Sequence, residues 1–325
     1  MIKKERTIPL KILILEALLR HLPLNHPKRQ QIAEELGRRR AGYQGEEALD
    51  YYYRSLSNQR YMIFHDLNLP DGDYNCQIDT LLLTPEFALV IEVKNMSGKL
   101  IFDTENEQLI QINNDKEKGY PYPIAQAERH QAYFKNLLAA HHFPPVPIDY
   151  IVVNSNSYAS YAITGKNAYH VKPRVSKGDV LLKKLQYFEN MYTDTVLTSK
   201  DLRKICRLLL KMNTPPTSYL LKKYGIQRTD LISGIHCPFC TSRLPLIRDK
   251  QKWYCPCCHN FSIDAHVNGL KDYFLLFDIK ITNKQFREFT HIKSPFTARR
   301  LLLSMNLNYS GANKVRVYFP KTFPW

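Results

Sequence analysis

The stretch Cys76–Asn95, CQIDTLLLTPEFALVIEVKN, is the most informative part of this chain, because it predicts a β-hairpin on which the neighbouring segments depend. Two runs rich in Ile, Leu and Val flank the tetrapeptide TPEF at residues 84–87. Apolar runs on either side of a proline-containing tetrapeptide are typical of strand, turn and strand. We therefore expect residues 76–83 and 88–95 to pair as antiparallel strands, with Pro85 and Glu86 in the turn.

The polar residues of this hairpin gather at its open end. A turn at Pro85 and Glu86 places Asp79 directly opposite Glu92, and Lys94 follows Glu92 by one strand period, so its ammonium projects from the same face. Opposed like charges destabilise a strand pair, and a divalent cation between the two carboxylates removes that repulsion. The structural alternative is an exposed Glu92–Lys94 ion pair on an edge strand. The apolar residues around these charges favour a site, because buried charges rarely lack partners.

Several motifs occur in a fixed order around this hairpin. They are GYQGEEAL from Gly42, HDLNLP from His65, QIDTLLLTPEFALVIEVKNMSGKL from Gln77 and PIAQAERHQAYFKNLL from Pro123. In this order they resemble the nuclease-related domain of bacterial proteins, a family placed in the PD-(D/E)xK nuclease superfamily. The resemblance covers about residues 40–165. It implies an α/β (α+β) fold, a restriction-endonuclease-like core with a mixed central sheet flanked by helices.

The resemblance also implies roles for individual residues. Asp79, Glu92 and Glu46 would hold Mg²⁺ or Mn²⁺. Lys94 would orient or activate the attacking water, and Gln126 would lie beside the site on the second core helix. These residue types permit metal-dependent phosphodiester hydrolysis without a covalent intermediate.

Two features weaken the match to the superfamily pattern. The usual Pro-Asp pair is Ile78-Asp79 here, so no proline supports the assignment of the aspartate. Glu46 is preferred to Glu47 because it directly follows Gly45, while a solvated glutamate at a helix start is an equally good explanation.

The lead hypothesis is therefore a Mg²⁺- or Mn²⁺-dependent deoxyribonuclease. The alternative is a catalytically inactive nuclease fold that binds DNA, RNA or a protein, and RNA as substrate also stays open. The sequence contains no GxSxG elbow, Walker GxxxxGK or HExxH, so serine hydrolysis, P-loop phosphoryl transfer and zincin chemistry lack support.

The net charge of +16 is unevenly distributed along the 325 residues. Residues 41–160 carry more Asp and Glu than Lys and Arg, whereas residues 201–325 carry most of the basic surplus. Lys and Arg supply most non-specific affinity for nucleic acid by neutralising phosphates. We therefore expect a metal-binding core that a basic appendage holds on nucleic acid, with DNA as the expected partner; a merely soluble basic protein is the simpler alternative.

A second motif is Cys237-Pro-Phe-Cys240 followed, after fourteen residues, by Cys255-Pro-Cys-Cys258. Two CxxC knuckles at this separation present four thiolates to a structural Zn²⁺, and Trp253-Tyr254 suits the hairpin of a zinc ribbon. An iron–sulfur cluster, a redox pair or disulfides are the alternatives. Cys257 competes with its neighbour as a ligand, but only Cys258 completes the x₂ spacing, and His236 and His259 lie close by in sequence.

The C-terminal residues predict a helix-turn-helix. Thr282 caps NKQFREF, and Ser294-Pro295 opens the helix FTARRLLLSM. Lys293, Arg299 and Arg300 are its candidate nucleic-acid-binding residues. A small packing domain is the alternative, because the turn lacks the glycine often found there. The alternation of KVRVYF at residues 314–319 indicates a wing or an edge strand.

The N-terminal residues 8–19, IPLKILILEALL, predict an amphipathic helix packing on the core. They fall short of the roughly 20 apolar residues that span a bilayer, and no small-residue cleavage site follows them. We expect no membrane association and a cytoplasmic location. The other expected elements are a helix, a glycine-marked break and a second helix over 28–53, a strand pair over 97–112, a helix over 121–138, a strand over 148–154 and a helix over 200–212.

The chain divides by composition into five expected parts, with Pro215-Pro216 as a boundary signal. They are an N-terminal helical arm (1–40), the nuclease-like core (41–165), a core extension and helical linker (166–230), the zinc ribbon (231–266) and the helix-turn-helix module (267–325).

Overall fold

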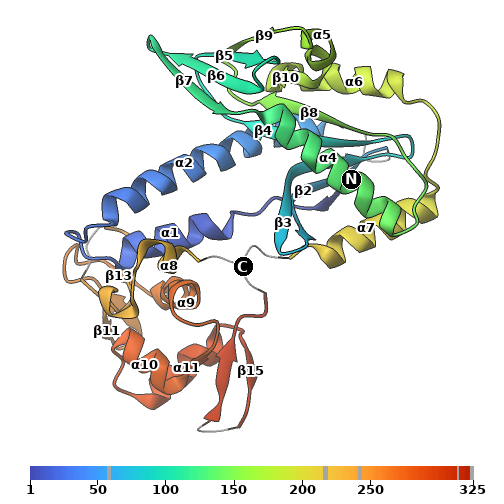
Figure 1. Ribbon diagram of the computed structural model, residues 1–325. Helices are drawn as coiled ribbons and strands as arrows, with labels where there is room; N and C mark the ends of the chain where they lie inside the picture. The colour runs from blue at the N-terminus through green and yellow to red at the C-terminus, as the bar shows by residue number, and fades with distance from the viewer. Residues whose placement is uncertain (57–59, 215–218, 241–243, 313–314, 323–325) are drawn as a thin grey trace. The chain divides into compact units, whose positions relative to one another are not determined.

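The computed structural model describes residues 1–56, 60–214, 219–240, 244–312 and 315–322 (Figure 1). The chain forms two compact units. The first consists of Met1–Thr7 and Arg40–Pro216, and the second of Ile8–Arg39 and Thr217–Trp325. The chain passes from the second unit into the first within one helix, α2 (Arg29–Ala48). The predicted boundary at Pro215-Pro216 lies outside the described residues.

The first unit is built on a six-stranded mixed sheet, which confirms the expected fold class. The strand order is β1-β2-β3-β4-β8-β10. The strands β2, β3 and β4 are antiparallel, whereas β1, β8 and β10 run parallel to their neighbours. Their bounds are Ile2–Lys4 (β1), Met62–Asp71 (β2), Tyr74–Leu83 (β3), Ala88–Lys94 (β4), Ile148–Asn154 (β8) and Val175–Lys177 (β10).

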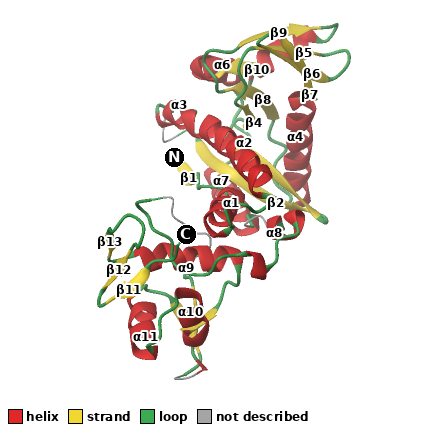
Figure 2. Cartoon of the chain, turned by 90° about the vertical axis from the view of Figure 1, so that its left-hand side faces the viewer, coloured by secondary structure: helices red, strands yellow, loops and turns green. Residues whose placement is uncertain are grey.

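Both faces of this sheet are covered, which explains why its strands read as continuous apolar runs. The helices α4 (Pro123–Ala140) and α7 (Ser199–Met212) pack on the face that includes Val90 and Val152 (Figure 2). The helices α3 (Asp50–Arg54) and α6 (Leu181–Met191) pack on the face that includes Leu89 and Val153. The predicted helix from residue 121 and the predicted strand at 148–154 are thus confirmed.

A second sheet of four strands adjoins this core, in the order β7-β6-β5-β9. It contains the predicted pair, β5 (Lys99–Asp103) and β6 (Gln108–Asn113), which are antiparallel. The strands β7 (Lys116–Pro121) and β9 (Ser160–Thr164) extend it on either side. Short helical segments then lead to α6: α5 (Ala168–Val171), η1 (Lys172–Arg174) and η2 (Gly178–Val180).

The predicted glycine-marked break within residues 28–53 is wrong. The helix α2 runs without interruption through Gly37, Gly42 and Gly45 and ends at Ala48, before α3 begins at Asp50. Glycine costs only about 1 kcal/mol in a helix interior, so tertiary packing can override it. Of these glycines, Gly45 is the one that permits close packing, as described below.

The second unit joins the helix predicted near the N-terminus to the C-terminal residues. The helix α1 (Leu10–His21) packs against α8 (Leu220–Tyr224) and α9 (Ala265–Leu276) of the second unit, and not on the nuclease-like core as expected. Asp272 of α9 accepts hydrogen bonds from Arg20 at 2.6 and 2.9 Å. The unit also contains η3 (Arg228–Asp230) and a small sheet of β11 (Ile247–Asp249), β12 (Lys252–Tyr254) and β13 (Phe261–Ser262). None of the helices described is long and apolar enough to cross a membrane.

The predicted helix pair near the C-terminus forms as α10 (Asn283–Thr290) and α11 (Pro295–Ser304). The side chains of Thr282 and Ser294 cap their N-termini as expected. His291 takes the left-handed conformation (φ 60°) that glycine would otherwise supply. Of the two expectations for residues 314–319, a wing or an edge strand, the edge strand is wrong, since β16 (Val317–Phe319) is the middle strand between β14 (Ile281–Thr282) and β15 (Asn308–Ser310).

Candidate active site

The site lies where β3 and β4 separate. The turn forms as predicted, with a hydrogen bond from the Thr84 N–H to the Phe87 carbonyl. The ladder then follows the predicted register from Leu83–Ala88 to Thr80–Ile91 and ends there, one pair before Asp79 and Glu92. Beyond that point β4 pairs only with β8. The Asp79 carboxylate accepts the Val93 N–H at 2.8 Å in place of a backbone partner from β3.

An irregularity between β2 and β3 turns Asp79 out of the ladder. His65 pairs with Thr80 and Leu67 pairs with Ile78, but Asp66 and Asp79 between them do not pair. Asp66 has a positive φ of 49°, a conformation uncommon outside glycine. Such irregularities re-aim side chains next to functional sites. Asp79 is therefore free to face the space opened by the separating strands.

Glu92, Lys94 and Gln126 form one hydrogen-bonded set. The Lys94 ammonium donates to Glu92 Oε1 at 2.7 Å and to Gln126 Oε1 at 3.2 Å. The side chain of Glu92 is only 2% exposed, and Gln126 comes from α4. The other Glu92 oxygen lies 3.5 Å from His130 Nδ1, and neither of these two atoms has a hydrogen-bond partner among the residues that the structure describes. A buried carboxylate oxygen without a donor is a place for a cation or water.

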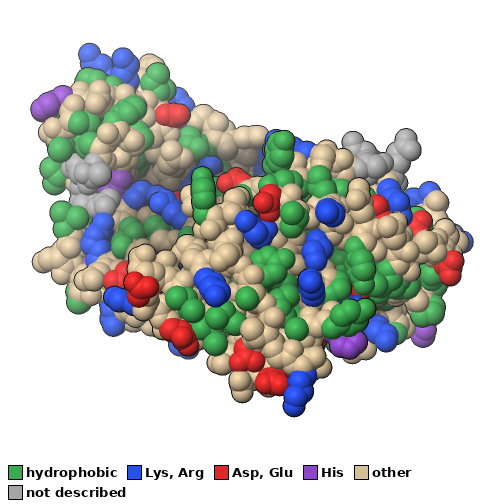
Figure 3. Space-filling view, turned by 90° about the horizontal axis from the view of Figure 1, so that it is seen from above, with side chains coloured by type: hydrophobic (Ala, Val, Ile, Leu, Met, Phe, Trp, Pro, Cys, Tyr) green, Lys and Arg blue, Asp and Glu red, His purple; other side chains and the backbone are tan. Residues whose placement is uncertain are grey.

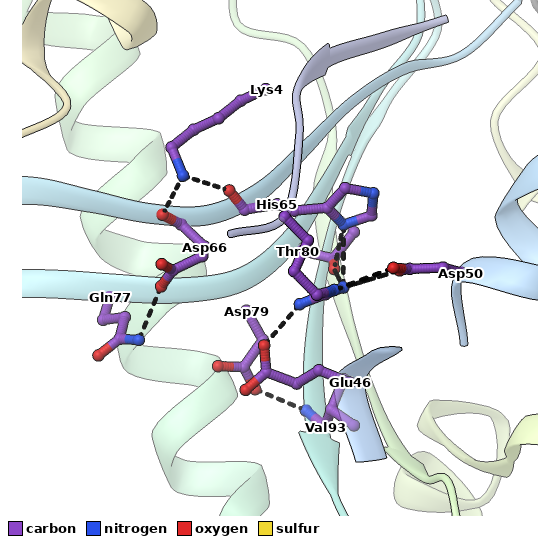
Figure 4. A network of polar contacts seen from close by, with 10 residues as sticks. Lys4, Glu46, Asp50, His65, Asp66, Gln77, Asp79, Thr80 and Val93 are labelled. Carbon is purple, nitrogen blue, oxygen red and sulfur yellow. Dashed lines mark hydrogen bonds and ion pairs between the residues drawn. The ribbon is translucent and has the colours of Figure 1, made fainter. Parts of the chain in front are cut away.

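Glu46 reaches the site because α2 packs closely at Gly45. A Cβ atom on Gly45 would lie 2.4 Å from Asn95 Cβ and 2.7 Å from Ser155 Oγ, so no larger residue fits without a shift. Glu46 then points toward Asp79 (Figure 4), while Glu47 is exposed. The Gly-Glu pair noted in the sequence thus has a steric reason.

Two basic residues of the N-terminal segment lie beside the site: Arg6 pairs with its carboxylates, and Lys4, which Figure 4 labels, binds the neighbouring backbone of β2. The Arg6 guanidinium, whose side chain is 4% exposed, contacts Glu46 Oε2 at 2.5 Å and Asp50 Oδ1 at 3.1 Å. Its Nη2 also lies 3.0 Å from His65 Nδ1. Lys4 donates to the carbonyls of His65 and Asp66 at 2.7 and 2.8 Å. Arg6 therefore neutralises part of the acidic cluster from within the protein.

The surroundings of Glu46, Asp79 and Glu92 disfavour the charged forms of these carboxyl groups. Burial, and then the charge of Asp79, raises the pKa of Glu46 and of Glu92 from 4.5 to about 8. Burial likewise raises the pKa of Asp79. Burial lowers the pKa of His65 to about 3 and that of His130 to about 4, so both imidazoles are neutral at pH 7. Buried carboxyl groups close to one another raise one another's pKa, because each charge disfavours the next.

The four predicted cysteines form a separate cluster in the second unit. The Sγ atoms of Cys237, Cys240, Cys255 and Cys258 lie within 4.8 Å of one another, and two of the pairs are 3.7 Å apart. Tetrahedral sulfur ligands about 2.3 Å from zinc are separated by about 3.8 Å, which these spacings match. Cys257 is exposed and outside the cluster. The cluster is thus compatible with a zinc ribbon, and Cys258 is its fourth member.

The three carboxylates are less converged than the cysteines. Among the described residues, the cysteines are the one group of three or more candidate ligands whose ligand atoms all lie within 4.8 Å of one another. The carboxylate oxygens of Glu46, Asp79 and Glu92 are therefore farther apart than that. The predicted nucleic-acid-binding residues Lys293, Arg299 and Arg300 are exposed around α11. They belong to the second unit, whereas the carboxylates belong to the first.

Sequence reasoning missed Arg6 and His130. His130 lies one helical turn after Gln126 on α4, so the i,i+4 spacing would have placed both on one face. Nothing in the local sequence connects Arg6 to Glu46, which is 40 residues away.

The comparison with known families agrees with the motif-based resemblance. Residues 41–155 match the model of the nuclease-related domain. No curated protein and no solved structure matches the chain. The first unit therefore carries a nuclease-related domain, to which Lys4 and Arg6 are contributed from outside the matched residues.

Proposed function

We propose that this nuclease-related-domain protein is a divalent-metal-dependent nuclease that hydrolyses phosphodiester bonds of DNA in the cytoplasm. The observation that carries the proposal is the meeting of Asp79, Glu92 and Lys94 at the point where β3 and β4 separate. The nuclease-related domain supports nucleic acid as the partner.

The residues present fit a divalent cation. The unpartnered oxygen of Glu92 and the raised pKa values of Glu46, Asp79 and Glu92 mark excess negative charge in a buried place. We assign these three carboxylates as the ligands of Mg²⁺ or Mn²⁺. Such an ion, when bound, polarises a phosphate oxygen and makes water a stronger nucleophile.

The other residues of the site have positioning and electrostatic roles. Glu92 and Gln126 hold the Lys94 ammonium from two sides, which fixes its charge where a phosphate would develop negative charge in the transition state. The Val93 N–H fixes the carboxylate of Asp79, and Gly45 allows Glu46 to approach. A preorganised charge of this kind avoids reorganisation during the reaction.

We assign structural Zn²⁺ to Cys237, Cys240, Cys255 and Cys258. A closed four-thiolate site contributes folding energy and leaves no position for a substrate. The exposed Lys293, Arg299 and Arg300 would add phosphate contacts from the helix-turn-helix.

The alternative is an inactive nuclease fold that binds nucleic acid. One observation favours it: Arg6 already neutralises Glu46, and the carboxylates are not drawn together. Cleavage assays separate the two hypotheses. Wild-type protein and Lys94→Ala are incubated with supercoiled DNA, single-stranded DNA and RNA, each with Mg²⁺, Mn²⁺ or EDTA.

We expect cleavage that requires metal and is lost in Lys94→Ala, with Lys99→Ala on β5 as the matched control. Metal-independent cleavage, or equal cleavage by Lys94→Ala, would contradict the proposed site. Binding without cleavage in every condition would favour the inactive fold, and cleavage of RNA alone would correct the substrate.

A further inference from the structure

A pocket on the first unit lies outside the candidate active site and combines basic with aromatic side chains. Its volume is about 500 Å³, within the range of about 300–1,000 Å³ typical of ligand pockets. One wall is formed by α5 and η1, and the other by η2 and α6. These elements lie together near β10 at the top of Figure 1.

The chemistry of the lining indicates an anionic ligand. Lys172, Arg174, Lys183 and Lys184 all line the pocket, and no Asp or Glu does. Arg174 is held by Asp149 through bonds of 2.7 and 2.8 Å, whereas Lys172 and Lys183 are exposed and form no ion pair with any described carboxylate. Figure 3 views the protein from above and shows basic (blue), acidic (red) and apolar (green) side chains together on this face. This basic surplus contrasts with the acidic balance of residues 41–160.

The pocket is held in shape by its own residues. Leu181, Leu185 and Phe188 are buried on one side of α6, which leaves Lys183, Lys184 and Tyr187 on the other. Lys184 donates a hydrogen bond of 2.8 Å to the Lys172 carbonyl and so connects the two walls. Burial, and to a smaller extent the nearby charge of Lys172, lowers the pKa of Lys184.

Two tyrosines add flat apolar surfaces to the pocket. Tyr169 is 83% exposed and Tyr187 is 39% exposed, one on each wall. Exposed aromatic rings beside cations are the means by which proteins hold single-stranded nucleic acid, since bases stack on the rings and phosphates meet the cations. Duplex DNA keeps its bases stacked inside and cannot use such rings.

We propose that this pocket binds one single strand of nucleic acid, with bases on Tyr169 and Tyr187 and phosphates at Lys172 and Lys183. The inference rests on the proposed function for the identity of the partner.

The test measures binding in EDTA, where no cleavage occurs, by the fluorescence anisotropy of labelled oligo(dT). Lys172→Gln/Lys183→Gln should weaken binding at least tenfold. It should also reduce the slope of log affinity against log salt by about 1.4, since each phosphate contact on a single strand contributes about 0.7. Tyr169→Ala should weaken binding roughly five-fold or more, while Tyr169→Phe keeps the ring and should bind as the wild type does.

The matched control is Lys99→Gln/Lys116→Gln, which removes two exposed lysines from β5 and β7 of the same unit and should leave affinity and slope unchanged. Equal loss in control and pocket variants would overturn the inference. Equal affinity for duplex DNA, or binding of phosphatidylserine vesicles but not of oligo(dT), would overturn it as well.

The outcome is separable from that of the proposed function. If wild-type protein cleaves DNA but the pocket variants bind oligo(dT) normally, the pocket inference is wrong and the nuclease stands. If binding depends on the pocket but no cleavage occurs with Mg²⁺ or Mn²⁺, the pocket stands and the nuclease proposal fails.

Discussion

Asp79 and Val93 are joined by a hydrogen bond of 2.8 Å from the Val93 N–H to the Asp79 carboxylate, across the point where β3 leaves β4. A side chain here replaces a missing backbone partner. The same carboxylate that we assign to metal binding therefore also stabilises the end of a strand.

Two substitutions of Asp79 separate these roles. Asp79→Asn keeps an oxygen that accepts the Val93 N–H, so we expect near-normal stability and loss of metal-dependent cleavage. Asp79→Ala leaves that N–H without its partner and should cost a further roughly 1–3 kcal/mol. Urea denaturation of both variants checks this, and equal stability would mean that the hydrogen bond contributes little.

Gly45→Ala should impair the site because its Cβ would overlap Asn95. We expect a loss of stability and of cleavage, since Glu46 would be displaced from Asp79. Gly42→Ala is the matched control, because nothing lies within 4 Å of its Cβ position; it should stabilise α2 by about 0.4–1 kcal/mol. Thermal unfolding and cleavage rates measure both, and a neutral Gly45→Ala would refute the close-packing argument.

The metal-free protein should lose stability as the pH rises from about 4.5 to about 8. In this window Glu46 and Glu92 stay protonated in the folded state, because their pKa values are raised to about 8, while they ionise in the unfolded chain. In this window the folded state therefore binds more protons than the unfolded state. The free energy of unfolding falls as the pH rises, and this contribution to stability is lost once the pH passes the folded-state pKa.

Melting temperatures in EDTA across this range measure the effect. Glu46→Gln/Glu92→Gln should flatten the dependence, whereas Glu47→Gln, at an exposed position, should not. A wild-type melting temperature that does not fall toward pH 8 would contradict the raised pKa values.

The thiolate cluster gives a prediction about bound zinc. Cys258→Ser should lower the zinc content and destabilise the second unit, because a structural site that loses a ligand loses folding energy. Cys257→Ser should retain zinc, since that thiol is exposed and outside the cluster. Elemental analysis measures the zinc content of each variant, and thermal unfolding measures its stability. If Cys258→Ser retained zinc and Cys257→Ser lost it, Cys257 and not Cys258 would be the fourth ligand.

The sequence predicted the elements whose signals are local. The Thr84–Phe87 turn, the register of β3 and β4, the helix α4 and the strand β8 all follow from periodicity and proline placement. The position of Lys94 relative to Glu92 follows from the same two-residue period.

What could not be predicted depends on long-range packing. The unpaired Asp66 and Asp79 result from an irregularity shared by two strands, and the Arg6–Glu46 pair joins segments 40 residues apart. The reason for glycine at position 45 of α2 likewise lies in Asn95 and Ser155, which are distant in the sequence. Such features leave no periodic trace in the sequence.

The division of the second unit into distant segments has a consequence for synthesis. The helix α1 packs on α8 and α9, which begin some 200 residues later in the chain. At about 5–20 residues per second, the ribosome delivers α8 roughly 10–40 s and α9 roughly 12–50 s after α1 emerges. During that interval neither helix can cover the side of α1 that packs on them, so the second unit can form only after its C-terminal segment has been synthesised.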